Sequence, residues 1–388
     1  MQSFEMTTEI QQLLSWFREN ARSLPWREKR TPYRIWVSEI MLQQTRVEAV
    51  KGYFERFMTA LPEAKDLAAV SEDELLKLWE GLGYYNRVRN MQKAARIVCE
   101  QYEGELPSDY EELLKLPGIG TYTAGAIASQ AFGIPVPAVD GNVLRVLARI
   151  DGDESDIADP AVKKRIEERL SSVMQTHFPL KLTVDLNQAD ILNQTSKHNR
   201  IDDLNWADDL NRAGDFNQAL MELGATVCVP NGAPKCDVCP MQYRCRAYAE
   251  NRQDFLPVKS PKKPRTIEEK TVFIIVNDRQ VLIRKRAQKG LLAGMYEFPN
   301  TEGYLTEREV LHYVEGLGFT GLRIEELPDT RHIFTHREWH MKSYRVSVAD
   351  TFEVGGLPQE MLLVNRMQIE ETYALPSAFS RFTKYVKM

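Results

Sequence analysis

The sequence predicts two successive domains of different class, an all-α region followed by a smaller α+β domain. With 388 residues, the chain is too long for one ordinary hydrophobic core. Apolar residues recur at helical spacing from the start to about residue 175. From Thr271 onward the pattern changes to short apolar runs typical of strands: TVFIIV (271–276), QVLIRKR (280–286) and MKSYRVSV (341–348).

The helices of the first region have recognisable beginnings and ends. Ser71 precedes an acidic first turn and is expected to cap a helix in SEDELLKLWEGLG. Proline and glycine end another helix in SDYEELLKLPGIG, and TYTAGAIASQAFG begins the next. The remaining predicted helices lie in residues 31–57, 137–150, 159–175 and 215–227, and one helix near 306–316 lies among the strands.

We therefore expect a helical region at 1–250, a linker at 251–268 and a second domain at 269–388. The linker is interpreted as stiff and basic because it holds three prolines among lysines and arginines. Residues 176–212 are rich in Asn and Asp and are interpreted as an inserted surface loop, with a short helix around Ile201–Leu210. The sequence assigns this insertion no function.

Composition restricts the class of protein. Hydrophobic residues make up 43% and charged residues 27%, as in a soluble globular protein. No apolar run approaches the roughly 20 residues that span a bilayer, and the first residues lack the pattern of a secretory signal. A cytoplasmic protein without membrane contact is expected. The net charge of −5 argues against unselective coating of nucleic acid, although local basic patches could still bind phosphates.

Four of the five cysteines, Cys228, Cys236, Cys239 and Cys245, fall within eighteen residues. In a reducing compartment such a group indicates a metal site more than disulfides. A zinc ribbon usually needs two Cys-x-x-Cys pairs, and only one is present here. A single short loop that supplies four thiolates favours a cubane iron–sulfur cluster, with zinc as the alternative.

A turn and two carboxylates are further candidates for function. Gly118 and Gly120 of LPGIG lie between two helices, where exposed backbone N–H groups could bind a phosphate; a plain turn is the alternative. Glu39 lies on a strongly apolar helix, so burial should raise its pKa and suit it to donate a proton. Asp140 precedes the helix NVLRVLARI. A salt-bridge partner at Glu39 and an N-cap at Asp140 are the structural alternatives.

Together these features resemble the MutY-type adenine DNA glycosylases of the helix-hairpin-helix superfamily. The resemblance implies an all-α helix-hairpin-helix glycosylase domain, with a six-helix barrel module and an iron–sulfur cluster loop at 228–245, followed by an α+β Nudix-like domain. The matching segments, in order, are LPWR (24–27), WVSEIMLQQTRVE (36–48), WEGLGYYNRVRN (79–90), LPGIGTYTAGAI (116–127), AVDGNV (138–143) and the cysteine loop.

The resemblance also implies residue roles. Glu39 would protonate adenine and then activate water, and Asp140 would stabilise the sugar cation, with Tyr122 and Asn142 beside it. A lysine at position 122 would favour strand cleavage, as in endonuclease III-like enzymes, whereas a phenol cannot form an iminium. Residues expected to contact the flipped adenine and the opposite base are Arg22, Leu24, Trp26, Arg27, Leu42, Gln44, Thr45, Tyr84 and Glu222. The phosphate-binding hairpin would be Leu116, Gly118 and Gly120.

The C-terminal domain is similar to the Nudix-related 8-oxoguanine reader of this family, most clearly in RKRAQKGLLAGMYEFPN (284–300). The following helix has too few acids for a hydrolase, so binding without hydrolysis is expected. Phe334, Thr335 and His336 match the loop that senses the oxidised base. Thr335 stands where serine is usual, and the first cysteine gap holds seven residues in place of six. Asn231-Gly232 can absorb that extra residue in a turn.

The expected function is hydrolysis of the N-glycosidic bond of adenine paired with 8-oxoguanine or guanine in double-stranded DNA, by a monofunctional base-flipping enzyme that acts as a monomer. One 4Fe–4S cluster is expected, without a nucleotide cofactor or a catalytic metal. Three alternatives remain: a bifunctional endonuclease III-like glycosylase/lyase, a Nudix nucleotide hydrolase and a catalytically silent damage-binding protein. Tyr122 opposes the glycosylase/lyase, and the sparse acids of the C-terminal helix oppose the Nudix hydrolase. The presence of both Glu39 and Asp140 opposes the catalytically silent protein.

Overall fold

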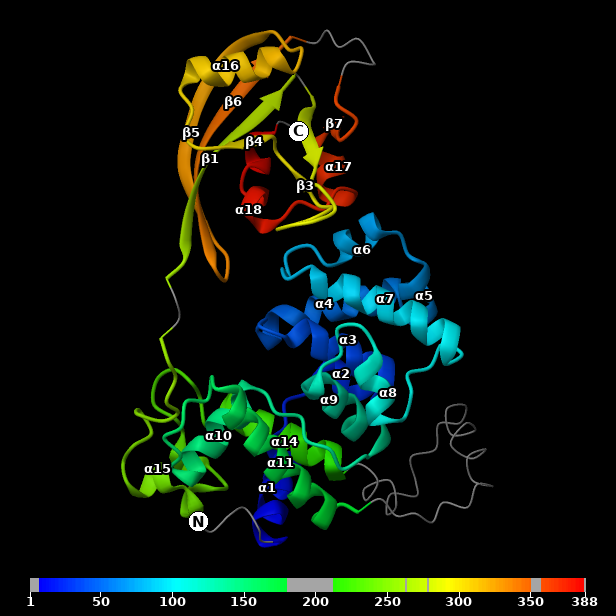
Figure 1. Ribbon diagram of the computed structural model, residues 1–388, viewed down its shortest axis with the longest axis vertical. Coiled ribbons are helices and arrows are strands. Elements are labelled where there is room, and N and C mark those ends of the chain that lie inside the picture. Colours follow the sequence, from blue (N-terminus) through cyan, green and yellow to red (C-terminus); the bar gives the residue numbers. More distant parts are fainter. Residues whose placement is uncertain (1–6, 180–211, 262–263, 278, 350–356, 387–388) are drawn as a thin grey trace. The chain divides into compact units, whose positions relative to one another are not determined.

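The computed structural model describes residues 7–179, 212–261, 264–277, 279–349 and 357–386. Most of the insertion predicted at 176–212, with its expected short helix, lies outside these residues. The chain forms two compact units (Figure 1). Unit 1 comprises residues 1–68 and 90–261, and unit 2 comprises residues 69–89 and 262–388. Residues 69–89, which we expected in the helical region, therefore belong to unit 2.

Unit 1 is helical, as predicted. The segment 31–57 forms two helices, α3 and α4, separated at residues 43–46. The helices with residues in this unit are α1(Thr7–Asn20), α2(Pro25–Glu28), α3(Pro32–Leu42), α4(Val47–Ala60), α5(Ala64–Ala69), α7(Asn86–Gln101), α8(Tyr110–Lys115), α9(Thr121–Phe132), α10(Gly141–Asp151), α11(Pro160–His177), α14(Arg212–Thr226) and α15(Arg246–Ala249), with the 3-10 turns η2(Cys236–Val238) and η3(Gln242–Arg244).

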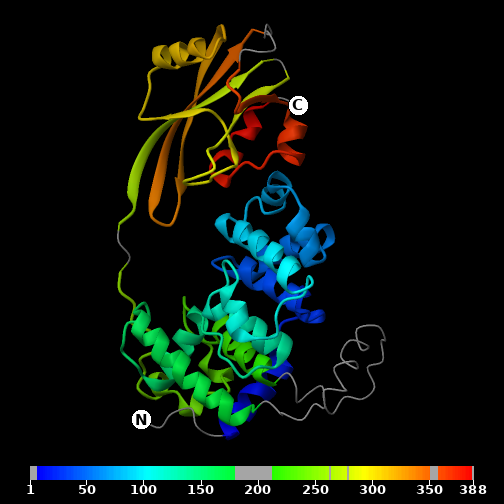
Figure 2. The same ribbon diagram turned by 45° about the vertical axis from the view of Figure 1, so that its right-hand side comes forward.

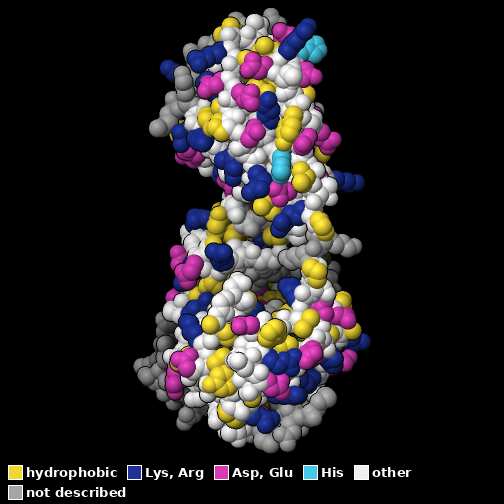
Figure 3. Space-filling view, turned by 90° about the vertical axis from the view of Figure 1, so that its left-hand side faces the viewer, with side chains coloured by type: hydrophobic (Ala, Val, Ile, Leu, Met, Phe, Trp, Pro, Cys, Tyr) yellow, Lys and Arg dark blue, Asp and Glu magenta, His cyan; other side chains and the backbone are white. Residues whose placement is uncertain are grey.

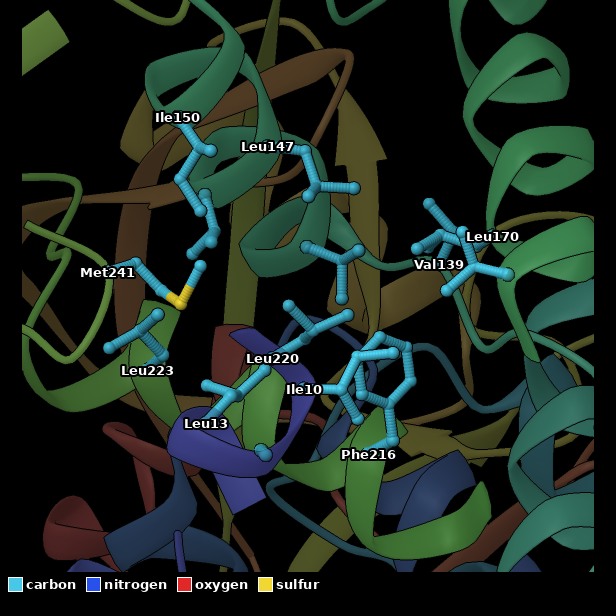
Figure 4. Packing of buried hydrophobic residues seen from close by; sticks show 14 of the residues in the cluster. Ile10, Leu13, Val139, Leu147, Ile150, Leu170, Phe216, Leu220, Leu223 and Met241 are labelled. Carbon is cyan, nitrogen blue, oxygen red and sulfur yellow. The ribbon is translucent and has the colours of Figure 1, made fainter. Parts of the chain in front are cut away.

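One hydrophobic core packs α1, α10, α14 and the cysteine loop together (Figure 4). Ile10 and Leu13 of α1 pack with Leu147 of α10 and Phe216 of α14, and all four are nearly inaccessible to solvent. Met241 of the cysteine loop joins the same cluster. The core thus fixes the start of α10, the length of α14 and the cysteine loop relative to one another.

An extended segment leads from α9 into α10 and is held from two sides. A Cβ at Gly125 of α9 would lie 2.1 Å from the carbonyl oxygen of Pro137, so only glycine permits this approach. From α14, the Asn217 amide donates to the Val136 carbonyl at 2.9 Å and its oxygen accepts from the Ala138 N–H at 3.1 Å. These contacts fix the backbone immediately before Asp140.

Unit 2 contains a seven-stranded mixed sheet, in which five strands follow the order β3-β2-β1-β6-β5, β4 also pairs with β1, and β7 also pairs with β2. β1 and β6 are parallel, and the other pairs are antiparallel. The strands are β1(Thr266–Val276), β2(Val281–Lys285), β3(Tyr296–Glu297), β4(Asn300–Glu302), β5(Gly321–Ile333), β6(Arg337–Val348) and β7(Met361–Val364); the helices are α6(Glu72–Leu78), α16(Glu307–Gly316), α17(Arg366–Glu371) and α18(Ser377–Ser380), with the 3-10 turn η4(Thr383–Tyr385).

The two faces of this sheet are covered separately (Figure 2). Ile274 of β1 packs with the C-terminal helices, whereas its neighbour Ile275 packs with α16. The three predicted strands and the predicted helix near 306–316 are confirmed. The strands β3, β4, β5 and β7 were not predicted from the sequence. Among the described residues, every helix is either too short or too polar to cross a membrane.

Candidate active site and cysteine pocket

Glu39 lies on α3 with only 6% of its surface exposed. Its Oε2 accepts a short hydrogen bond from the Tyr122 hydroxyl, and its Oε1 accepts from the Gln130 side-chain amide at 3.2 Å. Burial raises the pKa of Glu39, because the charged form loses hydration, although both hydrogen bonds oppose this rise. Both of these partners are neutral, so neither adds a positive charge that would lower the pKa further.

Asp140 is the N-cap of α10, which confirms the structural alternative for this residue. Its Oδ1 accepts from the backbone N–H groups of Asn142 and Val143, each at 2.9 Å. Its Oδ2 accepts from the Asn142 side chain at 2.6 Å. Burial raises the pKa of Asp140 despite these bonds. The capping role is compatible with a catalytic one, because the capping hydrogen bonds hold the Asp140 carboxylate in one orientation.

Tyr122 connects the two carboxylates electrostatically. Its hydroxyl contacts Glu39 and lies 3.5 Å from the Met221 sulfur on α14. Burial and the charges of Glu39 and Asp140 raise the pKa of Tyr122 well above its ordinary value, so the phenol stays neutral. The structure therefore places Tyr122 in direct contact with Glu39 and close enough to Asp140 for its charge to act on the phenol, and Asp140 in turn binds Asn142.

A second cluster in unit 1 gathers around Glu222, which is 1% exposed. Arg22 Nε lies 2.6 Å and Arg27 Nη2 lies 2.9 Å from its carboxylate. Burial opposes ionisation of Glu222, but hydrogen bonds and charge from the two arginines hold its pKa below the usual range. Leu24 and Trp26, between the arginines in sequence, are both buried.

Two further predicted residues share an unusual backbone. Gln44, in the turn between α3 and α4, has φ +61°, and Tyr84 of unit 2 has φ +49°. A positive φ is costly for residues other than glycine and often marks a functional position. Both side chains are exposed, while Leu42 and Thr45 beside Gln44 are half-buried.

The hairpin between α8 and α9 forms as expected. Leu116 is buried, and Gly118 has φ +81°. A Cβ at Gly118 would lie 2.8 Å from the Cβ of Asn90, so the glycine is needed for both space and conformation. Gly120 caps α9 with an ordinary φ of −99° and faces open space.

The turn between β5 and β6 carries Phe334, Thr335 and His336. Phe334 packs edge-on against Trp339 and donates its N–H to the Arg337 carbonyl at 2.9 Å. The hydroxyls of Thr335 and Tyr84 lie 2.7 Å apart, within unit 2. The structure thus joins two residues that the sequence associated with the base opposite adenine. The exposed side chain of His336 adjoins them in the turn.

The four clustered cysteines line one pocket of unit 1. Its walls include Val146, Ile150, Leu223 and Val227. Arg149 donates to the Cys228 sulfur at 3.3 Å and to the Val229 carbonyl at 3.0 Å. Within the described parts of the chain, no three His, Cys, Asp or Glu side chains gather closely enough to bind a single metal ion.

Sequence reasoning missed three buried polar residues of these sites: Gln130, Arg145 and Arg149. Arg145 donates to the Asn142 side-chain oxygen at 2.9 Å and so supports the neighbour of Asp140. The available signal was a polar side chain inside an otherwise apolar or small-residue helix, in ASQAF and in NVLRVLARI. That signal indicates burial but does not name a partner.

Comparison with known proteins gives the class. Residues 37–172 match the HhH-GPD superfamily of base excision DNA repair proteins, and residues 271–385 match the NUDIX domain. The helical unit thus has the fold of the HhH-GPD base excision DNA repair proteins. An adenine DNA glycosylase of Buchnera aphidicola is 35% identical over 292 residues, covering 75% of this chain and 74% of that protein. The chain belongs to the adenine DNA glycosylase family.

A second curated relative matches over more of the chain. The adenine DNA glycosylase of Homo sapiens is 32% identical over 416 residues, covering 91% of this chain and 69% of its own length. Among solved structures, a thermostable thymine-DNA glycosylase has a TM-score of 0.48 at 26% identity, covering 63% of this chain and 96% of that one. The predicted fold class and the predicted enzyme, a DNA glycosylase of base excision repair, are confirmed by the two family matches and the curated relatives.

Proposed function

We propose that this glycosylase hydrolyses the bond between adenine and deoxyribose where adenine is paired with 8-oxoguanine or guanine in double-stranded DNA. The observation that carries the proposal is the buried Glu39 carboxyl, whose pKa burial raises, hydrogen-bonded to the neutral Tyr122 phenol. Such a carboxyl keeps its proton at a higher pH than an exposed one, which suits a general acid.

Glu39 acts twice in the proposed reaction. Its proton passes to a ring nitrogen of adenine as the bond from N9 to C1′ breaks, and the electron pair leaves with the base. The resulting carboxylate then takes a proton from water, whose oxygen bonds to C1′. Glu39 ends protonated again, so the acid is regenerated without a cofactor.

Asp140 stabilises the positive charge that develops on the sugar. Three hydrogen bonds fix its carboxylate, two from backbone N–H groups and one from Asn142. A preoriented anion needs little reorganisation when the cation forms. Because Tyr122 offers no amine, no Schiff base forms there, and the reaction stops at the abasic site.

The flipped adenine is proposed to lie beside the Glu222 cluster. Arg22 and Arg27 keep Glu222 ionised, so this carboxylate can accept a hydrogen bond from the exocyclic amine of adenine. Trp26 and Leu24, with Leu42 at the end of α3, supply the apolar contact for a base taken out of the stack.

The base opposite adenine is proposed to be read by two exposed regions. Gln44 and Thr45 lie in one turn of unit 1; Tyr84 and Thr335 form a hydroxyl pair in unit 2. In the C-terminal domain, Glu297 is held by Arg284 at 2.6 Å and also by Arg286. A carboxylate already paired with two arginines is poorly suited to magnesium, which supports binding without hydrolysis.

The residues of the cysteine pocket fit the proposed 4Fe–4S cluster. Thiols are the donors that iron–sulfur clusters require, and Arg149 donates to the Cys228 sulfur as a hydrogen-bonding group beside a thiolate should. Cys228, Cys236, Cys239 and Cys245 would hold the cluster, which when bound braces the loop between α14 and α15. Visible absorbance and an iron assay distinguish it from zinc.

The deciding experiment is single-turnover cleavage of a duplex with one adenine opposite 8-oxoguanine. We expect an abasic product that breaks only in alkali, no borohydride-trapped adduct, and near-complete loss of activity in Glu39→Gln. A strong covalent adduct would favour the glycosylase/lyase, and an active Glu39→Gln variant would reject the acid. The cytoplasmic location and monomeric state stay predictions.

A further inference from the structure

Both oxygens of the Glu39 carboxyl are bound by residues of one helix, α9. Tyr122 in its first turn donates to Oε2, and Gln130 donates to Oε1 at 3.2 Å. Eight residues at 1.5 Å each place the Cα atoms of these two residues about 12 Å apart along the helix axis, and their side chains converge on the one carboxyl. The two oxygens therefore face donors that come from opposite ends of α9.

These two donors differ in what they can do when Glu39 gains a proton. A phenol is both donor and acceptor, so Tyr122 can turn and accept a hydrogen bond from a protonated Oε2. The side-chain amide of Gln130 is oriented with its N–H toward Oε1, and in this orientation it donates, so its contact persists while Oε1 offers a lone pair. An oxygen that receives an N–H bond is the poorer place for the proton.

We propose that Gln130 is a positioning residue that keeps Oε1 of Glu39 as an acceptor and leaves the transferable proton on Oε2. This proposal rests on the proposed role of Glu39 as general acid. Gln130 is 7% exposed and sits in a helix otherwise rich in small and apolar residues, so the contact is shielded from water. A shielded hydrogen bond to a carboxylate is stronger than an exposed one.

The other groups that act on Glu39 are few. Arg27 of α2 favours its charged form, Asp140 ahead of α10 disfavours it, and Tyr122 of α9 binds it directly. Gln130 is uncharged and acts through its contact alone. Removing that contact should therefore raise the pKa of Glu39 without altering the charges around it.

The test replaces Gln130 with methionine, which has similar length and no N–H donor. Losing one hydrogen bond to a carboxylate should raise the pKa of Glu39 by about one unit. The Glu39 signal is followed in a carbon-13 NMR titration of the full chain without DNA, assigned with Glu39→Gln. Single-turnover adenine release is measured over the same pH range, and its descending limb should move upward by the same amount.

The matched control is Gln92→Met, at a second glutamine of unit 1 that is 6% exposed and lies on α7. It should leave both titrations in place. An unshifted Glu39 titration in a folded Gln130→Met protein overturns the proposal, as does an equal loss of rate at every pH. If the methionine variant unfolds, Gln130→Asn, whose amide ends one methylene short, must show the same upward shift.

The two proposals fail in distinguishable ways. An active Glu39→Gln variant would reject the general acid, whereas the NMR titration would still report whether Gln130 holds the carboxyl. Conversely, an unchanged titration in Gln130→Met would leave the loss of activity in Glu39→Gln intact.

Discussion

The Tyr122 hydroxyl donates a hydrogen bond to Oε2 of Glu39, and this contact joins the first turn of α9 to the middle of α3. Burial raises the pKa of Glu39, and the phenol limits that rise by stabilising the charged form. The same carboxylate raises the pKa of the phenol. In this pair the phenol therefore stays neutral, and the pKa of the carboxyl lies above its ordinary value.

Tyr122→Phe should raise the pKa of Glu39 further, because the ionised form loses a donor. The descending limb of the single-turnover pH profile should move upward by about one unit. Because folding raises this pKa, its contribution to stability is present below the unfolded-state pKa and is lost as pH rises through the folded pKa. Urea unfolding at several pH values measures this slope. Tyr102→Phe, at a residue that contacts Glu112, is the control and should leave the profile unchanged.

Glu222→Gln should destabilise unit 1, because it leaves Arg22 and Arg27 without the carboxylate that pairs with both. Breaking a buried ion pair costs about 3–5 kcal/mol, and the partial exposure of Arg22 brings our expectation to roughly 2–3 kcal/mol. The midpoint of urea unfolding measures the loss. Glu63→Gln, which removes an exposed partner of Lys65, should leave the stability close to that of wild type.

The loss of stability in Glu222→Gln should become smaller as the pH falls. Folding lowers the pKa of Glu222, so its contribution is present above the unfolded-state pKa and disappears as pH falls through the folded value. Wild type and Glu222→Gln should therefore converge in stability on acidification. A difference that persists unchanged in acid would mean that packing, and not charge, makes Glu222 stabilising.

The sequence predicted those features that depend on neighbours along the chain. Ser71 forms the expected capping box with Glu74, and Gly118 occupies the expected turn. It could not name the partners of Glu39 or Glu222, because Gln130 and Arg22 lie 91 and 200 residues away along the chain. Similarity to a known family, rather than spacing, assigned Glu39, Glu222 and Arg22 to one site.

The longest of the strands that the sequence did not predict, β5, was missed for a physical reason. β5 is an edge strand with one pairing neighbour, and most of its side chains are exposed. Its sequence, GLRIEELPDTRHI, therefore lacks the alternation that a half-buried strand shows. Charged residues and a proline protect such an edge from pairing with other chains. On the molecular face in Figure 3, acidic and basic side chains are interspersed.

Gly118→Ala should lower stability, because the new Cβ would meet Asn90 in a left-handed backbone. We expect a loss of about 1–3 kcal/mol in urea unfolding. Gly120→Ala has ordinary backbone geometry and open space, so its stability should stay near that of wild type. If the hairpin binds phosphate, Gly120→Ala should still weaken binding to undamaged duplex in fluorescence anisotropy. Unchanged binding would reject the phosphate site at this turn.

Arg149→Met should loosen the cysteine pocket. Arg149 is 5% exposed and donates to the Leu256 carbonyl at 2.8 Å as well as to Val229 and Cys228. Leaving those acceptors unpaired should cost about 2–4 kcal/mol in thermal or urea unfolding and speed the loss of iron to a chelator. Arg165→Met, which removes an exposed partner of Asp153, should keep both properties. Iron retention equal to wild type would contradict a role for Arg149 at the sulfur.

Tyr84 and Thr335 should act as one unit in selecting the opposite base, because their hydroxyls lie 2.7 Å apart. Tyr84→Phe and Thr335→Val should each reduce the preference for 8-oxoguanine over guanine by about five- to tenfold, the worth of one neutral hydrogen bond. The double variant should lose little more than either single variant, since the first change already breaks the pair. Thr335→Ser keeps the hydroxyl and should retain the preference. Single-turnover rates on the two duplexes give the ratio, and losses that multiply in the double variant would show that the two hydroxyls read the base independently.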